Sequence, residues 1–224
     1  MALVIGMTLG LLGGGGSILT VPVLVYMLHI DPMVSTGYSL FIVGISAAVG
    51  AFGYYRNKEI DLKTAAIFGV PAIVAVYFAR KVLVPAIPDE ITEIGSFMLT
   101  KDIAIMVLFA LLMIAASYSM IKGRKDKEDG SGVIRYNYPM ILLEGLVVGI
   151  LTGLVGAGGG FLIIPALVLF SGLSMKKAVG TSLIIIAVKS LIGFMGDVQN
   201  HSIDWVFLLS FAALAVLGII AGTQ

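Results

Sequence analysis

Long apolar segments separated by short polar loops make up most of the chain. Each unbroken segment has about 20 residues, the length that a helix needs to cross a hydrocarbon core of about 30 Å. None alternates polar and apolar residues as the strand of a membrane barrel does, so we expect helices to span the membrane. The segments comprise residues 1–28, 34–55, 64–87, 102–121, 139–170, 178–196 and 203–222.

Two of these segments, 1–28 and 139–170, are interrupted by glycine clusters of similar sequence. When residues 3–62 are aligned with residues 146–205 without a gap, at a constant offset of 143, 21 of 60 positions are identical. We therefore predict two homologous repeats, residues 1–121 and 139–224. A doubled apolar run that glycine breaks in each copy is typical of transporters built from two repeats around one central site.

The charged segment 122–138 separates the repeats, and we expect it to be a polar linker on the cytoplasmic side, which Lys and Arg favour. The same rule places the basic loop 56–63 inside, and only Arg80 and Lys81 do not fit the pattern. The first repeat contains four apolar segments and the second contains three. An eighth helix is therefore expected to be missing from the chain.

Basic residues also predict how the repeats are oriented. The loop 29–35 has no Lys or Arg whereas its counterpart has Lys176 and Lys177, and the basic loop 56–63 corresponds to 199–204, which has neither. Opposite charge bias predicts inverted repeats, in which each glycine-broken segment is a hairpin of two half-helices that enters and leaves on one side. If those segments instead cross the membrane, the repeats are parallel, and the sequence leaves this alternative open.

Composition supports the same class. Hydrophobic residues form 59% of the chain, charged residues form 12%, and the mean hydropathy is +1.08, so we predict an all-α polytopic membrane protein. The net charge of +1 argues neither for nucleic acid nor for an acidic partner, and we expect no nucleic-acid partner. Because the chain has no Cys, thiolate catalysis and thiolate metal sites are excluded, and we expect no metal and no cofactor.

The glycine clusters are the predicted site of chemistry. A second half-helix begins after each cluster, and the N–H groups of its first turn have no helical partner. Such helix starts bind anions, and glycine lets a ligand approach the backbone closely. We predict one anion site shared by both turns; the alternative is that the glycines only allow close helix packing. The predicted binding residues here are Gly14, Gly15, Gly16, Ser17, Gly158, Gly159 and Gly160.

Hydroxyl and charged side chains add to this site. Ser39, Thr181 and Ser182 lie near the start of the helix after each cluster, where a hydroxyl either caps the helix or donates to an oxyanion. Lys189 lies within an apolar segment, where a charge costs about 2.5–3.5 kcal/mol. We expect Lys189 to be the countercharge of a bound anion; the alternatives are snorkelling or a structural tie to a carbonyl or to Glu144.

Other polar residues have ordinary predicted roles. Asp61 and Asp204 lie at helix ends, where N-capping of the next helix is the expected role. Asp197 and His201 are compatible with proton coupling, but we expect a loop position in which both are solvated.

The glycine clusters also carry a resemblance. GLLGGGGSILTVP at 10–22 and GLVGAGGGFLIIP at 153–165, with Gly180–Leu183 and Ile203–Trp205 behind the second copy, resemble the sulfite exporter TauE/SafE family, also grouped as toluene sulfonate uptake permeases. The resemblance covers nearly the whole chain except the linker. It implies transport of small sulfur-containing anions, such as sulfite, sulfonates or sulfoacetate, across the bacterial inner membrane. Members have four plus four hydrophobic segments, and this chain departs from them by lacking the eighth.

We therefore expect a multi-pass carrier in the inner membrane that works by alternating access, has the sulfur anion and the lipid bilayer as its partners, and is compatible with a homodimer. Export is slightly favoured, because the negative cell interior makes outward movement of an anion downhill by about 2.3 kcal/mol per charge and 100 mV. The alternatives are an anion channel and an intramembrane enzyme. An enzyme is disfavoured because the two His residues, His29 and His201, both lie in predicted loops.

Overall fold

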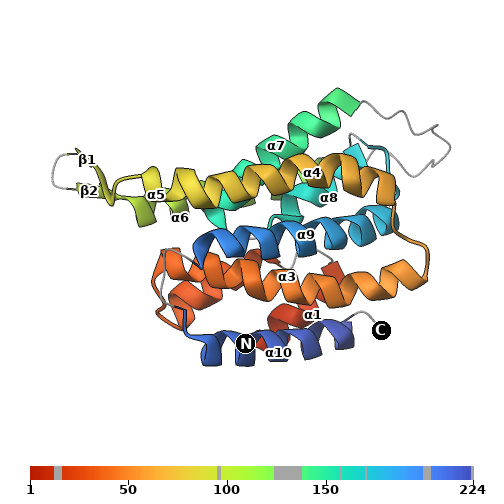
Figure 1. The fold of residues 1–224 in the computed structure, drawn as a ribbon, viewed down its shortest axis with the longest axis horizontal. Helices are drawn as coiled ribbons and strands as arrows, with labels where there is room; N and C mark the ends of the chain where they lie inside the picture. The colour runs from red at the N-terminus through yellow and green to blue at the C-terminus, as the bar shows by residue number, and fades with distance from the viewer. Residues whose placement is uncertain are drawn as a thin grey trace.

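The computed structural model describes residues 1–12, 17–94, 97–123, 138–156, 158–169, 171–198 and 203–222. Helices dominate, as apolar segments of this length require in a membrane (Figure 1). In chain order the elements are α1 (Ala2–Leu12), α2 (Thr20–Pro22), η2 (Val23–Met27), α3 (Pro32–Arg56), α4 (Leu62–Phe78), η3 (Ala79–Leu83), α5 (Val84–Ala86), β1 (Glu90–Ile94), β2 (Phe97–Thr100), α6 (Lys101–Gly123), α7 (Tyr138–Val155), α8 (Gly160–Leu169), α9 (Met175–Asp197) and α10 (Trp205–Gly222).

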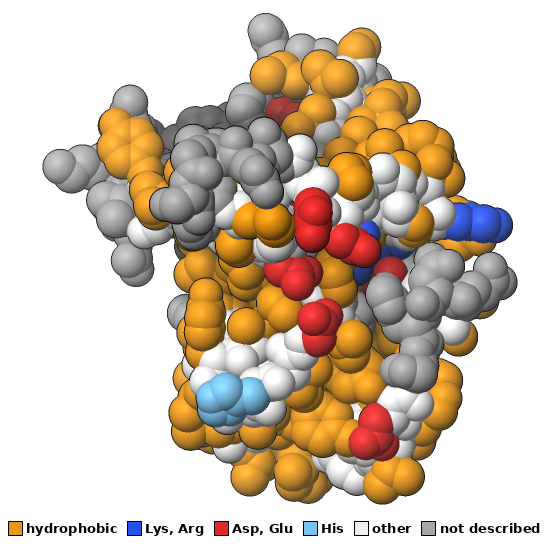
Figure 2. Space-filling view, turned by 90° about the vertical axis from the view of Figure 1, so that its left-hand side faces the viewer, with side chains coloured by type: hydrophobic (Ala, Val, Ile, Leu, Met, Phe, Trp, Pro, Cys, Tyr) orange, Lys and Arg blue, Asp and Glu red, His pale blue; other side chains and the backbone are white. Residues whose placement is uncertain are grey.

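Four helical stretches in the described ranges are long and apolar enough to cross a bilayer: Pro32–Arg56, Leu62–Ala86, Met175–Asp197 and Trp205–Gly222. Large apolar side chains on these helices remain exposed, for example Val206 on α10 and Val70 on α4. Hydrophobic side chains also surround the end of the molecule seen in Figure 2. An apolar surface of this extent needs lipid around it, so the all-α membrane class is confirmed.

One element was not expected from the sequence. β1 and β2 form a two-stranded antiparallel hairpin between α5 and α6, at the left-hand end of Figure 1. The backbone of Asp89 accepts a hydrogen bond from Lys101 N at 3.0 Å, which closes the base of the hairpin. Two strands of five and four residues give only a weak alternating pattern, which is too short to predict a strand from the sequence.

The helices α3 and α9 lie side by side at the centre of the bundle (Figure 1). Gly37 near the start of α3 lies against Asp197 at the end of α9, and Gly180 near the start of α9 lies against the side chain of Tyr54 near the end of α3. The two helices therefore run antiparallel. Glycine at both contacts removes the Cβ atom that would separate the helices.

Two further helix pairs join the two halves of the chain. In α1 and α10, Gly6 lies against the backbone of Ala215 and Gly218. In α7 and α4, Gly149 lies against Ala72 and Ala75. At the offset of 143, Gly149 corresponds to Gly6, and Ala72 and Ala75 correspond to Ala215 and Gly218. Each half thus contributes the first helix of its glycine-broken segment to a helix of the other half.

Two hydrogen bonds between the halves also correspond to each other at the offset of 143 residues. Asp61 N donates to Thr181 Oγ1 at 2.9 Å, and Asp204 N donates to Tyr38 Oη at 2.7 Å, with both partners shifted by 143 residues. The carboxylates of Asp61 and Asp204 also accept from the backbone N–H groups of residues 64 and 207. The predicted N-capping by these aspartates is confirmed.

We expect Tyr38→Phe to lower stability, because it leaves the backbone N–H of Asp204 without its phenol partner. The loss should be about 1 kcal/mol, which corresponds to a decrease in Tm of about 2–4 °C for a chain of this size. The measurement is thermal unfolding of the purified protein in detergent. Tyr26→Phe is the matched control, since Tyr26 is exposed and should leave Tm unchanged. An equal shift in both variants would contradict the assignment.

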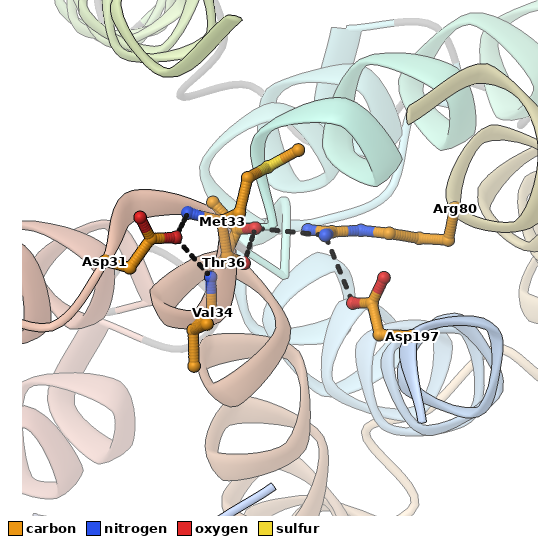
Figure 3. Close-up of polar contacts among 6 residues, drawn as sticks. All are labelled: Asp31, Met33, Val34, Thr36, Arg80 and Asp197. Atoms are coloured by element: carbon orange, nitrogen blue, oxygen red, sulfur yellow. Dashed lines mark hydrogen bonds and ion pairs between the residues drawn. The ribbon is translucent and has the colours of Figure 1, made fainter. Parts of the chain in front are cut away.

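The start of α3 differs from expectation. Its N-cap is Asp31, whose carboxylate accepts from the N–H groups of Met33 and Val34 (Figure 3). Ser39 lies two turns inside the helix, and Ser182 Oγ donates to the carbonyl of Val179 within α9. Capping by these hydroxyls is therefore wrong, because both helices begin earlier than the sequence pattern predicted.

Candidate functional site

The second glycine turn connects α7 to α8 through left-handed backbone. Gly156, Gly158 and Gly159 have φ angles of +75°, +65° and +74°. All three are buried, and a residue with a side chain adopts such angles only with strain. A Cβ atom on Gly158 would lie 2.5 Å from Val43 and 3.5 Å from Cβ of Ser17. Ser17 of the first repeat therefore lies beside the turn of the second. Gly14, Gly15 and Gly16 lie outside the described residues.

The first turn of α8 presents peptide N–H groups. Leu162 N and Ile163 N both donate to Gly159 O at 3.0 Å, so the helical bonds begin there. The N–H groups of Gly160 and Phe161 precede them and have no acceptor within the helix. These N–H groups and the helix dipole place partial positive charge at the turn.

Lys189 reaches this turn from α9. Its side chain is fully buried, and Nζ donates to Thr152 Oγ1 at 2.6 Å. A Cβ atom on Gly159 would lie 2.8 Å from the same Nζ. Among the described residues no carboxylate pairs with Lys189, and the buried oxygens of Glu144 have no hydrogen-bond partner. The structure therefore shows a hydroxyl partner for Lys189, where the sequence left open a tie to Glu144 or a carbonyl.

Arg80, in η3, is a residue that sequence analysis missed. Its side chain is 1% exposed, and Nη1 donates to Thr36 Oγ1 at 3.0 Å and lies 3.1 Å from the carboxylate of Asp197 (Figure 3). Nη2 lies against Gly156, at the start of the glycine turn. Arg80 was one of the two basic residues that did not fit the charge pattern, and that misfit was the signal of a buried cation.

The expected solvation of Asp197 is wrong. Asp197 is the last residue of α9 and is 4% exposed, because α9 continues to that position and Gly37 lets α3 approach it. His201, its proposed companion, lies outside the described residues. Together Arg80, Asp197 and Lys189 carry a formal net charge of +1 in the buried cluster.

The remaining predicted residues lie apart from the turn or have other partners. Thr181 and Ser182 precede Lys189 by eight and seven residues, which is about 10–12 Å along α9. Thr181 accepts the hydrogen bond from Asp61 N described above, so it holds two helices together. Ser39 is buried and its hydroxyl has no hydrogen-bond partner among the described residues, which leaves it able to donate.

The groups at the turn are of the kinds that bind anions. Two buried cations, Arg80 and Lys189, lie at the two ends of the glycine turn, and the N-terminal N–H groups of α8 follow it. In the described part of the chain no group of three His, Asp or Glu side chains comes together in the way that a metal ion requires.

A helical bundle with membrane-spanning helices and a buried cluster of positive charge defines an integral membrane protein. The family model of the sulfite exporter TauE/SafE matches residues 1–224, and the chain belongs to this family. The predicted family is thereby confirmed.

Relatives agree with this assignment. The chain is 28% identical over 223 residues to a "Probable membrane transporter protein" of Xylella fastidiosa (strain 9a5c), covering 98% of this chain and 80% of the relative. It is 25% identical over 220 residues to "Probable membrane transporter protein YdhB" of Bacillus subtilis (strain 168), covering 98% and 85%. No solved structure matches the chain. The family and these relatives identify a membrane transporter.

Proposed function

We propose that this transporter carries small sulfur-containing anions, such as sulfite, sulfonates or sulfoacetate, across the bacterial inner membrane. The observation that carries the proposal is the Lys189 ammonium, which lies buried beside Gly159 at the start of α8 and has no carboxylate partner among the described residues. A buried cation of this kind favours a transient anionic partner. The family description supports the sulfur chemistry of that anion.

The packing supports inverted repeats. α3 and α9 are equivalent by the 143-residue offset, and they run antiparallel. α10 runs parallel to α3, since Tyr38 stacks on Phe207 and Gly50 lies against Ile219. α1 runs parallel to α10 in turn, because Gly6 meets Ala215 and Gly10 meets Gly222. α1 and α3 therefore point the same way, and the chain between them must return, which favours a hairpin over a crossing segment.

Alternating access fits this arrangement. The structure is closed around the glycine turn, since a Cβ atom on Gly156 or Gly159 would overlap neighbouring side chains. A small cleft at the end of α9, lined by Val34, Gly37, Tyr38, Phe194, Asp197 and Ile203, has room for about one water molecule. An anion would therefore reach Lys189 only after the helices separate, and the inverted pairs allow that separation on either face.

Export is the favoured direction. Acidic side chains gather on the end of the molecule shown in Figure 2, and Arg56, Lys58 and Lys63 lie near the opposite ends of α3 and α4. By the positive-inside rule, the acidic end faces outward. Its negative charge lowers the local concentration of anions there and opposes their return.

Counterflow in proteoliposomes tests the function. Vesicles loaded with excess unlabelled sulfite or sulfoacetate should accumulate the labelled anion transiently, because a carrier exchanges one anion for another. A channel would equilibrate the label without this overshoot. If the protein exchanged no sulfur anion under conditions in which it stays folded, the proposed substrate class would be wrong.

A further inference from the structure

Only one of the three guanidinium nitrogens of Arg80 makes polar contacts among the described residues. Nη1 contacts Thr36 and Asp197, whereas Nε and Nη2 are buried and have no hydrogen-bond partner among the described residues. Buried donors without partners are costly, and an ion pair kept only for stability would be expected to satisfy them. The Nε–H and Nη2–H groups share one planar edge, which is the fork that binds two oxygens of an oxyanion.

This unpartnered edge lies at one end of the glycine turn, and Lys189 lies at the other. Asp197 lines the small cleft at the end of α9, and Arg80 lies directly behind Asp197. Nη2 of Arg80 meets Gly156 at one end of the glycine turn, and Nζ of Lys189 meets Gly159 at the other. An anion that moves from the cleft toward Lys189 therefore passes the guanidinium first.

We propose that Arg80 is a second anion-binding residue, one step outside Lys189, and that Asp197 is the counterion that limits how tightly this step holds the anion. The inference rests on the proposed function and extends it to residues outside the predicted site. The oxyanion binds the Nε–Nη2 edge while Asp197 stays near Nη1. The negative charge of Asp197 repels the bound oxyanion and so weakens its binding. A carrier needs such weak binding in order to release its substrate.

Opposite effects of two neutralising variants test the proposal. Equilibrium binding of sulfoacetate to the purified full chain in detergent should weaken about tenfold or more in Arg80→Gln, as expected when a charge-assisted bidentate contact is lost. Binding should strengthen about tenfold in Asp197→Asn, and counterflow should slow because release becomes limiting. Lys81→Gln, which neutralises the adjacent exposed lysine, is the matched control and should bind as the wild type does.

A purely structural ion pair predicts a different pattern. Both single variants would then lower Tm without opposite effects on affinity, and Arg80→Gln/Asp197→Asn would restore Tm with wild-type binding; that result would overturn the proposal. If Arg80→Gln does not fold, Arg80→Lys replaces it, since lysine keeps the charge but lacks the fork and should still lose affinity. Unchanged or weaker binding in folded Asp197→Asn would also overturn it.

Different results would show that Arg80 does not bind the anion and that the proposed substrate class is wrong. If Lys189→Gln abolishes sulfoacetate binding while the Arg80 and Asp197 variants bind like the wild type, Arg80 is not a binding residue and the proposed function stands. If the wild type binds no sulfur anion, the substrate class is wrong, and nitrate and acetate become the probes. Opposite effects of the two variants on either probe would then still support an anion step at Arg80, and equal affinities would reject it.

Discussion

Replacing Lys189 with methionine should abolish anion exchange while leaving the protein folded. Methionine keeps most of the side-chain volume and removes the ammonium that lies beside Gly159. Losing one partner of a buried charge contact costs about 2–5 kcal/mol, so counterflow of the carried anion should fall by about 30-fold or more. Because Lys189 has only the Thr152 hydroxyl as its described partner, the free energy of unfolding should not decrease.

Lys177→Met is the matched control for this variant. Lys177 lies on the same helix, near its exposed start, so its loss changes the net charge equally without touching the turn. It should retain wild-type exchange. If Lys189→Met exchanged anions as fast as Lys177→Met, Lys189 would be a structural residue and the proposed site would be wrong.

A single methyl group at Gly159 should have the next largest effect. The Cβ atom of Gly159→Ala would overlap the side chain of Thr152 and would lie 2.8 Å from Nζ of Lys189, at a φ angle of +74°. Left-handed backbone costs a residue with a side chain about 1–2 kcal/mol, and overpacking costs about 1–3 kcal/mol. We expect a marked decrease in Tm and loss of counterflow, because the hydrogen bond between Lys189 and Thr152 cannot keep its geometry.

Variants of two other glycines distinguish the effect of backbone strain from the effect of steric overlap with neighbouring side chains. Gly172 has a φ angle of +65° and open space around its Cβ position, so Gly172→Ala carries the backbone strain alone. It should lose about 1 kcal/mol of stability and keep transport. Gly53 lies in α3 with open space around it, and Gly53→Ala should be neutral or stabilising. If Gly159→Ala behaved like Gly172→Ala in both measurements, close contact at the turn would not be needed for transport.

The glycine contacts between the two halves suggest which parts move together. The pairs α1 with α10 and α4 with α7 each join the two halves through glycine contacts. Such contacts leave little freedom for sliding, because the backbones themselves touch. We expect each pair to move as a unit during alternating access, so the moving bodies would mix helices from both repeats. The α3–α9 contact at the centre would then be the surface about which they rock.

The order of residues along the chain was enough to establish the class, the family and one of the two buried cations. Hydrophobic length decides whether a segment can cross a bilayer, and that property is read from consecutive residues without knowing their neighbours in space. The glycine clusters and their repetition indicated the family for the same reason, since they are contiguous patterns. Lys189 was recognisable because a charge in the middle of an apolar helix is costly and therefore rare unless it has a function.

Only the three-dimensional packing showed which helices meet. It also revealed the second buried cation, Arg80. Arg80 and Asp197 are 117 residues apart, and neither has a local pattern that names the other. Their contact exists because η3, which continues α4, packs against the end of α9 at Gly196, where the missing side chain lets Arg80 approach Asp197. The packing of helices also gave Thr181 a backbone partner across the halves and left Nε and Nη2 of Arg80 without a hydrogen-bond partner among the described residues. A buried polar contact depends on neighbours in space, and a linear sequence does not contain those neighbours explicitly.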